Sequence, residues 1–228
     1  MRLRLIILFF GLFCSVSLCY SQVTKDFGFW NTLNIEHKMN DDLTLSLTQE
    51  MRFKENVSRL NRFYTQLGLE YKLAKKVKTS LSYRFTQRLE DENYFSLRHR
   101  LIWDLNFKKN VDKFTFSYRH RLQSEVKKYY SSKLGRYPEW FYRHKLQAKY
   151  ELNKRIEPYF ATEVQIQLYD AGKMVDNREM NRVRFQLGTD IKLSAKKTFG
   201  IYYGFQNEFA TAKETDIYIL GLEYSIKF

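Results

Sequence analysis

The side chains of this sequence best suited to acid–base chemistry are the imidazoles of His37, His99, His120 and His144. A histidine beside a serine, oriented by an acidic or amide group, could activate a hydroxyl or a water molecule to attack a carbonyl group. His99, His120 and His144 share one face by alternation, and the alternate positions immediately beside them hold no serine. The sequence also has no metal-ligand spacing and no glycine-rich phosphate loop. We therefore predict no catalytic residue, no cofactor and no metal site.

Charged side chains form a second set, because arginines and carboxylates recur at every other position. In the stretch FTFSYRHRLQ, residues 114–123, the even positions are mostly apolar or aromatic, and the odd positions are polar. In each predicted strand, or at its end, the polar alternate positions hold the cations Arg52, Arg62, Arg84, Arg98, Arg100, Arg119, Arg121, Arg143, Lys145, Arg182 and Arg184, and the carboxylates Glu50, Glu70, Asp104, Glu163, Asp190, Glu208 and Glu223. Opposite charges so arranged can neutralise one another, and surplus guanidinium groups can bind anions.

These positions share one face only if the chain forms β-strands, in which alternate side chains point to opposite sides. Alternation with a period of two predicts strands at residues 27–37, 43–53, 63–73, 77–85, 95–107, 114–123, 140–152, 156–168, 182–193, 198–209 and 218–228. At about 11 to 13 residues, most exceed the five or six usual in soluble proteins. At about 3.3 Å per residue, tilted strands of this length cross the ~25 Å apolar band of an outer membrane.

The N-terminal residues have the pattern of a secretory signal peptide. Arg2 and Arg4 precede the apolar run LIILFFGLF, which is too short to span a bilayer as an ordinary helix, and small residues follow it. We predict that residues 1–21 are removed, and with them both cysteines, Cys14 and Cys19. No run of about 18 apolar residues follows, so the sequence predicts no bundle of membrane helices.

Long alternating strands predict an all-β fold, an antiparallel transmembrane β-barrel formed by residues 22–228. Connections such as AKK and NKR are short, whereas SEVKKYYSSKLGRYP is long, which is the rhythm of periplasmic turns and extracellular loops. Eleven segments conflict with the even strand number of bacterial single-chain barrels. Either one strand escapes the pattern, or the first segment is not an ordinary barrel strand. We expect ten to twelve strands, with a slight preference for twelve.

The last segment carries apolar residues at alternate positions up to an aromatic carboxy-terminal residue. These residues are Leu220, Leu222, Tyr224, Ile226 and Phe228. The pattern resembles the signal that outer-membrane barrels present to the barrel assembly machinery. Together with the signal peptide, it predicts the outer membrane of a Gram-negative bacterium as the location. The predicted partners are outer-membrane lipid, lipopolysaccharide and, during biogenesis, the assembly machinery.

The chain resembles the small outer-membrane β-barrels of Gram-negative bacteria that are grouped as domain of unknown function 2490. The resemblance rests on the early Trp30, on LTLSLTQEMRF, LEYKL and LSYRF, and on the repeated Tyr-Arg and Arg-x-Arg pairs in LRHRL and SYRHRL. It covers essentially residues 22–228. The resemblance implies a barrel and a location, and it brings no reaction and no catalytic residues.

A barrel surrounded by lipid would turn the charged positions toward its lumen. Paired charges would plug a narrow lumen, whereas surplus arginines would form an anion-preferring passage or cavity. We therefore predict a non-enzymatic barrel that is either structural or a narrow passage for anions or small solutes. The alternative is a lipid- or envelope-modifying barrel enzyme. The outward histidines are most simply polar residues near the headgroup boundary, although a metal cluster or lipid A phosphate contacts fit the same positions.

The charge balance, 39 Lys and Arg against 25 Asp and Glu, would ordinarily indicate nucleic acid as a partner. The predicted export of the protein, and the position of most aromatic residues on one face of the strands, argue against nucleic acid as a partner. The segment 124–138 instead carries Lys127, Lys128, Lys133 and Arg136 against the single carboxylate of Glu125. We predict an extracellular loop here, whose cations either contact lipopolysaccharide phosphates or simply keep the loop solvated.

Overall fold

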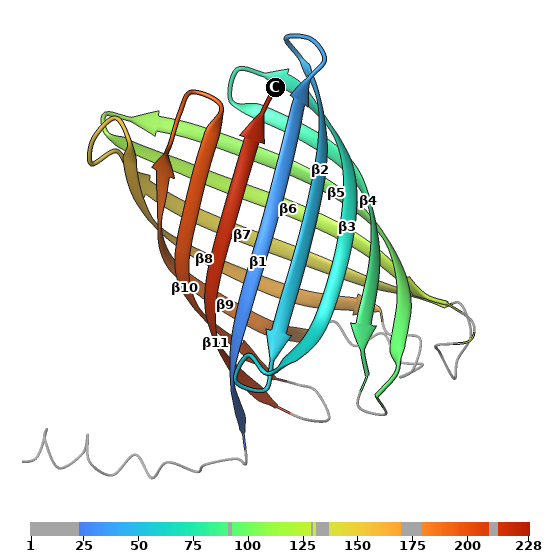
Figure 1. Cartoon of the computed structure of the whole chain (residues 1–228). Helices are drawn as coiled ribbons and strands as arrows, with labels where there is room; N and C mark the ends of the chain where they lie inside the picture. The colour runs from blue at the N-terminus through green and yellow to red at the C-terminus, as the bar shows by residue number, and fades with distance from the viewer. Residues whose placement is uncertain (1–22, 91–92, 129, 131–136, 170–178, 210–213) are drawn as a thin grey trace, which may run out of the picture.

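The computed structural model describes residues 23–90, 93–128, 130, 137–169, 179–209 and 214–228, so the predicted signal peptide lies outside the described residues. The strands are β1 (Thr24–Lys38), β2 (Leu43–Lys54), β3 (Arg59–Ala74), β4 (Val77–Leu89), β5 (Phe95–Val111), β6 (Phe114–Lys127), β7 (Pro138–Tyr150), β8 (Ile156–Tyr169), β9 (Glu179–Lys192), β10 (Lys197–Glu208) and β11 (Thr215–Lys227). They form one closed barrel (Figure 1). Among the described residues, no helix has both the length and the apolar character needed to cross a membrane.

The barrel closes through β1 and β11, which pair in parallel, whereas all other neighbours pair antiparallel. Trp30 lies opposite Gly221, and Asn34 lies opposite Ser225. Antiparallel strands alternate in direction, so the first and last of eleven strands point the same way and can pair only in parallel. Eleven lies within the expected ten to twelve, but the preference for twelve is not confirmed. The first segment is a full strand of the barrel, which resolves the conflict over strand number.

The two ends of the barrel differ in their connections. Tight turns lie at the end where β11 finishes, and the longer connections lie at the end where β1 begins (Figure 1). Asn40 and Asn153 tighten two of the turns, because each side-chain oxygen accepts hydrogen bonds from two backbone N–H groups that follow it. We call these the short-turn end and the long-loop end.

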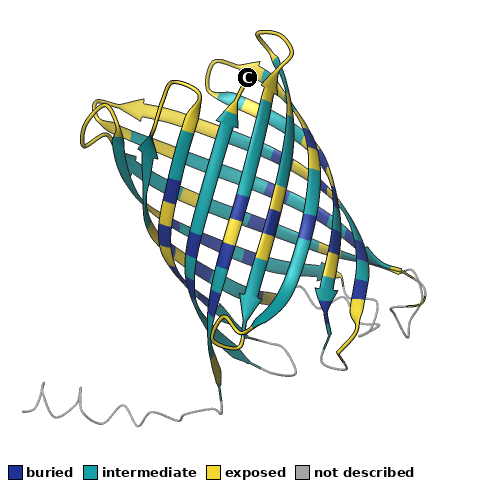
Figure 2. Cartoon of the chain, in the orientation of Figure 1, coloured by how far each residue is buried: buried dark blue, intermediate teal, exposed yellow. Residues whose placement is uncertain are grey.

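Alternation sorts the side chains into an apolar outer face and a polar inner face. Outward residues that are exposed include Leu81, Leu101, Phe116, Leu146, Phe160, Leu187, Ile201 and Tyr203. Buried positions alternate with exposed ones along the strands (Figure 2), and most of the buried side chains are polar or charged. This distribution is the reverse of that in a soluble protein, whose apolar residues are inside.

A small cluster of Trp30, Tyr202 and Ile219 packs inside the barrel next to the closing strands. Its packing depends on a glycine, because the Tyr202 ring lies directly over Gly221. A Cβ atom added at Gly221 would come within 2.0 Å of the ring carbon Cζ. Glycine therefore provides the space in which the ring lies against the backbone of β11.

We expect Gly221→Ala to lower the free energy of unfolding by about 1–3 kcal/mol, because the Tyr202 ring must leave its packed position. Gly204→Ala is the matched control, since a Cβ atom there meets its nearest atom at an ordinary 3.4 Å. Chemical unfolding of detergent-refolded protein, followed by tryptophan fluorescence, measures both variants. Equal stabilities of the two variants would contradict this account of the packing.

Candidate functional site in the barrel lumen

The charged residues selected by alternation lie on the inner face of the barrel. Contacts between non-neighbouring strands show this directly, since Arg119 on β6 reaches Glu163 on β8 at 2.7 Å. The same face carries Arg52, Arg84, Arg98, Arg100, Arg121, Arg143, Arg182 and Arg184, and the carboxylates Glu50, Glu70, Asp104, Asp190, Glu208 and Glu223. The strand alternation therefore brings these side chains together around one lumen.

Glu163 is the most heavily shared carboxylate of the lumen. It is buried and lies 2.7 Å from Arg143 and 3.4 Å from Arg184, in addition to its contact with Arg119. The three arginines come from β7, β9 and β6, so one carboxylate of β8 connects four strands. A buried carboxylate requires such partners, because the desolvation of a lone charge costs several kcal/mol.

Two further carboxylates hold arginines around the lumen. Asp104 accepts two hydrogen bonds of 2.6 Å from Arg121. Glu125, only 2% exposed, accepts hydrogen bonds of 2.9 Å from Arg98 and 2.7 Å from Arg100. The prediction that Glu125 belongs to the long loop is wrong, because β6 continues to Lys127 and turns this side chain inward. The alternation of polar residues through position 125 was the signal that would have placed it.

Glu90 lies just beyond β4 at the long-loop end. It accepts hydrogen bonds from Ser96 and Arg98. Partial burial acts to raise the pKa of Glu90, but these two donors outweigh it and leave the pKa below its ordinary value. The group is therefore ionised at neutral pH and contributes a fixed negative charge at this mouth.

Aromatic side chains also take part in the charge network. The guanidinium carbons of Arg52 and Arg184 lie 3.5 Å and 4.7 Å from the centre of the Trp30 ring. Arg84 lies 3.8 Å above the ring of Tyr64. Aromatic faces attract cations most strongly where water is excluded, so these rings add to the stabilisation that Glu50 and Glu163 give to Arg52 and Arg184, and they stabilise Arg84, which has no carboxylate partner among the described residues. The alternation in the sequence already indicates that Trp30 lies on the inner face, but it does not indicate which two arginines contact the ring.

Cations outnumber carboxylates on the inner face. Among the described residues, Arg62, Arg84, Arg88 and Lys145 have no carboxylate within ion-pairing distance. Arg84 instead donates two hydrogen bonds, of 2.9 Å and 2.6 Å, to Gln66. Arg88 lies beyond the predicted strand end at residue 85, because β4 extends to Leu89. The lumen therefore has a surplus of positive charge.

Side chains fill much of the lumen between its two mouths. Gln123 is 1% exposed and Gln206 is 3% exposed, although both lie on the inner face. The short-turn mouth is a charged depression of about 340 Å³, lined among others by Glu36, Lys78 and Lys227. Buried side chains therefore narrow the lumen between its two mouths.

The outward histidines pair with tyrosines. The Tyr118 hydroxyl lies 2.6 Å from Nδ1 of His144, Tyr142 bonds His120 in the same way, and Tyr83 lies 2.6 Å from His99. His120 and His144 lie near the middle of β6 and β7 rather than at strand ends. In the part of the chain that the structure describes, no group of three His, Cys, Asp or Glu residues could hold a metal ion.

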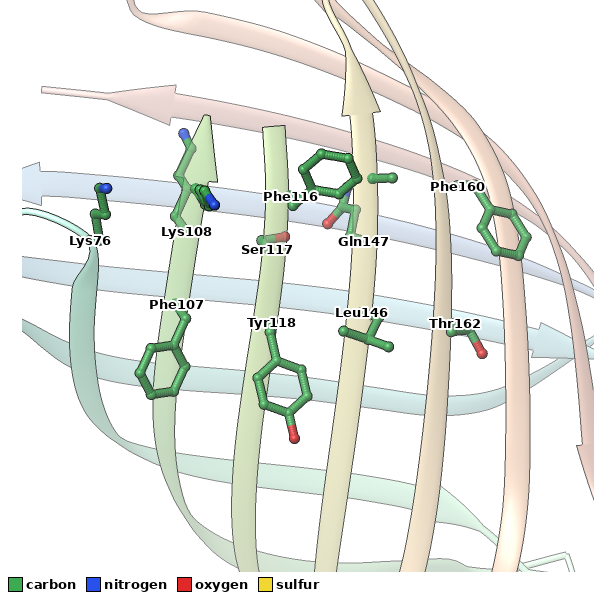
Figure 3. Close-up of a pocket in the computed structure, with 12 residues that line it drawn as sticks. Lys76, Phe107, Lys108, Phe116, Ser117, Tyr118, Leu146, Gln147, Phe160 and Thr162 are labelled. Atoms are coloured by element: carbon green, nitrogen blue, oxygen red, sulfur yellow. The ribbon is translucent and has the colours of Figure 1, made fainter. Parts of the chain in front are cut away.

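Beside Tyr118, the outer face has an apolar groove of about 570 Å³ (Figure 3). Phe107, Tyr118, Leu146 and Thr162 occupy one row across β5 to β8. In the next row, the small Ala148 lies between Phe116 and Phe160 and leaves the hollow.

The predicted assembly-signal residues of β11 lie away from the lumen. Leu220, Leu222, Tyr224 and Ile226 point outward from β11, and the backbone N–H of Phe228 bonds to the Glu36 carbonyl at 2.9 Å. In the segment 124–138, Lys127 belongs to β6 and lies 3.3 Å from Glu139. Lys133 and Arg136 lie outside the described residues, so the lipopolysaccharide contact stays a prediction.

We expect Glu163→Gln to lower the free energy of unfolding by about 3–5 kcal/mol, because three arginines lose their shared counter-charge. Glu70→Gln is the control. Glu70 pairs with the half-exposed Lys78 at 2.6 Å, and its loss should cost about 1 kcal/mol or less. Chemical unfolding at neutral pH compares the two variants. Similar losses in both would show that Glu163 is not the centre of the charge network.

Two solved structures and one family model are similar to this chain. A porin structure titled "NanC porin structure in rhombohedral crystal form" is 10% identical, has a TM-score of 0.49, and is matched over 79% of this chain and 85% of that chain. The translocator domain of the autotransporter NalP from Neisseria meningitidis is 14% identical, with a TM-score of 0.42, over 74% of this chain and 70% of that chain. No curated protein matches the chain. A family model matches residues 27–216, and this chain therefore belongs to the family described as "Protein of unknown function (DUF2490)".

Proposed function

We propose that this chain is a non-enzymatic outer-membrane β-barrel whose narrow, arginine-lined lumen admits small anions. The observation that carries the proposal is the reversed polarity of the barrel, with exposed apolar residues outside and charged residues inside. Such an outer face suits lipid acyl chains, and a closed ring leaves no strand edge unpaired in a medium without water. Outer-membrane lipid and lipopolysaccharide are the partners that this surface fits.

The surplus of cations supports anions as the preferred solutes. Four lumenal cations lack carboxylate partners among the described residues: Arg62, Arg84, Arg88 and Lys145. The oxygens of an oxyanion match the donor geometry of guanidinium groups. The second candidate is a purely structural barrel with a closed lumen, which the near-complete burial of Gln123 favours. An enzyme has less support, because in the described part of the chain His99, His120 and His144 bond tyrosines on the outer face.

The proposed location predicts how the protein fractionates. The full-length chain expressed in a Gram-negative host should be found in the outer-membrane fraction and should migrate differently on gels before and after boiling, because closed barrels resist detergent until heated. Recovery of folded protein in the soluble periplasmic fraction would refute the location.

The proposed passage predicts anion-selective conductance in planar bilayers. Arg84→Gln should shift the reversal potential in a salt gradient toward that of an unselective pore, because it removes a lumenal charge without leaving a carboxylate unpaired. Lys109→Gln is the control. Lys109 is exposed on the outer face near the end of β5, so its replacement removes no charge from the lumen and should leave selectivity unchanged. A correctly folded barrel that never conducts would support the structural candidate.

A further inference from the structure

Three arginines lie side by side on the inner face near the long-loop end. Arg52 on β2 is the register partner of Arg62 on β3, and Arg62 is the register partner of Arg88 on β4. Directly opposed residues have Cβ atoms about 4.5–5.5 Å apart, and like charges so placed destabilise a sheet. We call Arg52, Arg62 and Arg88 the arginine row. A row of this kind requires something that offsets its repulsion.

The described residues offset little of this charge. Arg52 pairs with Glu50 and covers the Trp30 ring. Among the described residues, Arg62 and Arg88 have no ion-pair partner, and the Nε atom of each is buried without a hydrogen-bond acceptor. Buried donors of this kind are rare, because each unsatisfied group lowers the stability of the folded state.

The carboxylates whose negative charge partly opposes that of the arginine row already form ion pairs with other arginines. Glu125 opposes the charge of Arg62, and Glu208 is among those that oppose the charge of Arg88. Glu125 already binds Arg98 and Arg100. Glu208 binds Arg182 at 2.8 Å, and Glu90 binds Arg98. None of these carboxylates is free to neutralise the row.

Arg182 on β9 extends the cationic surface beyond the row. The Nε atom of Arg182 is also buried without an acceptor. The positive charges of Arg52 and Arg88 are among those that repel the Arg182 guanidinium group. Unsatisfied guanidinium donors from the row and from β9 therefore face one region of the lumen near the long-loop end. Guanidinium forks bind the oxygens of phosphate and similar anions bidentately.

We propose that Arg62 and Arg88, assisted by Arg52 and Arg182, form a binding site for a small dianionic oxyanion, either phosphate itself or the phosphomonoester group of a small solute. The site lies near the ends of β2 and β4, so a solute entering from the long-loop end meets it before it reaches Glu163. This inference rests on the arginine-lined lumen proposed above, and it names the class of anion that the lumen selects.

The test is a titration of detergent-refolded, signal-free protein with sodium phosphate, compared with sodium chloride at equal ionic strength. A ligand that binds only the folded state raises the thermal unfolding midpoint with concentration. We expect phosphate to raise the midpoint saturably beyond the effect of chloride. Arg62→Gln and Arg88→Gln should each weaken the apparent affinity about tenfold or more, as the loss of one charge-assisted hydrogen bond does.

Two controls separate binding from structural damage. Arg59→Gln removes the same charge at the start of β3, where the partly exposed Arg59 lies 3.4 Å from Glu55, and it should keep the wild-type affinity. Without phosphate, Arg62→Gln and Arg88→Gln should be at least as stable as the wild type, since the row loses repulsion. A merely structural arginine would instead leave its variant less stable.

The absence of a phosphate-specific shift in the wild-type protein would overturn the site, as would an equal loss of affinity in Arg59→Gln. If Arg62→Gln does not fold, Arg88→Gln and the wild-type titration decide the question. The bilayer measurement is independent of this result. Anion conductance without phosphate stabilisation keeps the passage and removes the site, whereas stabilisation without conductance keeps the site and removes the passage.

Discussion

The backbone hydrogen bonds between β1 and β11 are the interaction on which the rest of the structure depends. An open β-sheet has two edges whose N–H and C=O groups need partners, and a ring has none. Because antiparallel neighbours alternate in direction, a ring of eleven strands must contain one parallel pair. The parallel pair places the start of β1 at the long-loop end and the finish of β11 at the short-turn end (Figure 1).

Closure turns one face of every strand into a confined lumen, and the confinement determines how charges must be arranged there. A carboxylate that loses its water needs several donors, which explains why Glu163 binds three arginines and Glu125 binds two. Trp30 links this network to the closing strands, because its ring lies on β1 and contacts arginines from β2 and β9. Two of the guanidinium groups left without carboxylates among the described residues, those of Arg62 and Arg88, lie side by side near the long-loop end.

The outer face follows the opposite rule, since apolar side chains cover it and polar groups there bond one another. His120 and His144 each bond a tyrosine of the neighbouring strand, so two imidazoles lie within the apolar surface with one ring nitrogen of each satisfied. The hollow at Ala148 shows that even this face is not uniform (Figure 3). Packing of large rings around one small residue is sufficient to produce it.

The period-two pattern of the sequence is sufficient to locate the strands and to assign each residue to a face, because this period specifies both at once. It was enough to expect an all-β barrel and to place Arg121 and Glu163 on the same side. The pattern locates strand ends less well. It therefore places Glu125 in a loop and does not include Arg88 among the charges of the inner face.

The strand number follows from the closed ring and not from the pattern, because alternation does not specify whether the first and last strands meet. The tertiary structure also decides which charges are neutralised. Ion pairs such as Arg119–Glu163 skip a strand, and the contact of Trp30 with Arg184 joins residues far apart in the chain. These partners depend on the register and curvature of the closed ring, which a pattern within single strands does not contain.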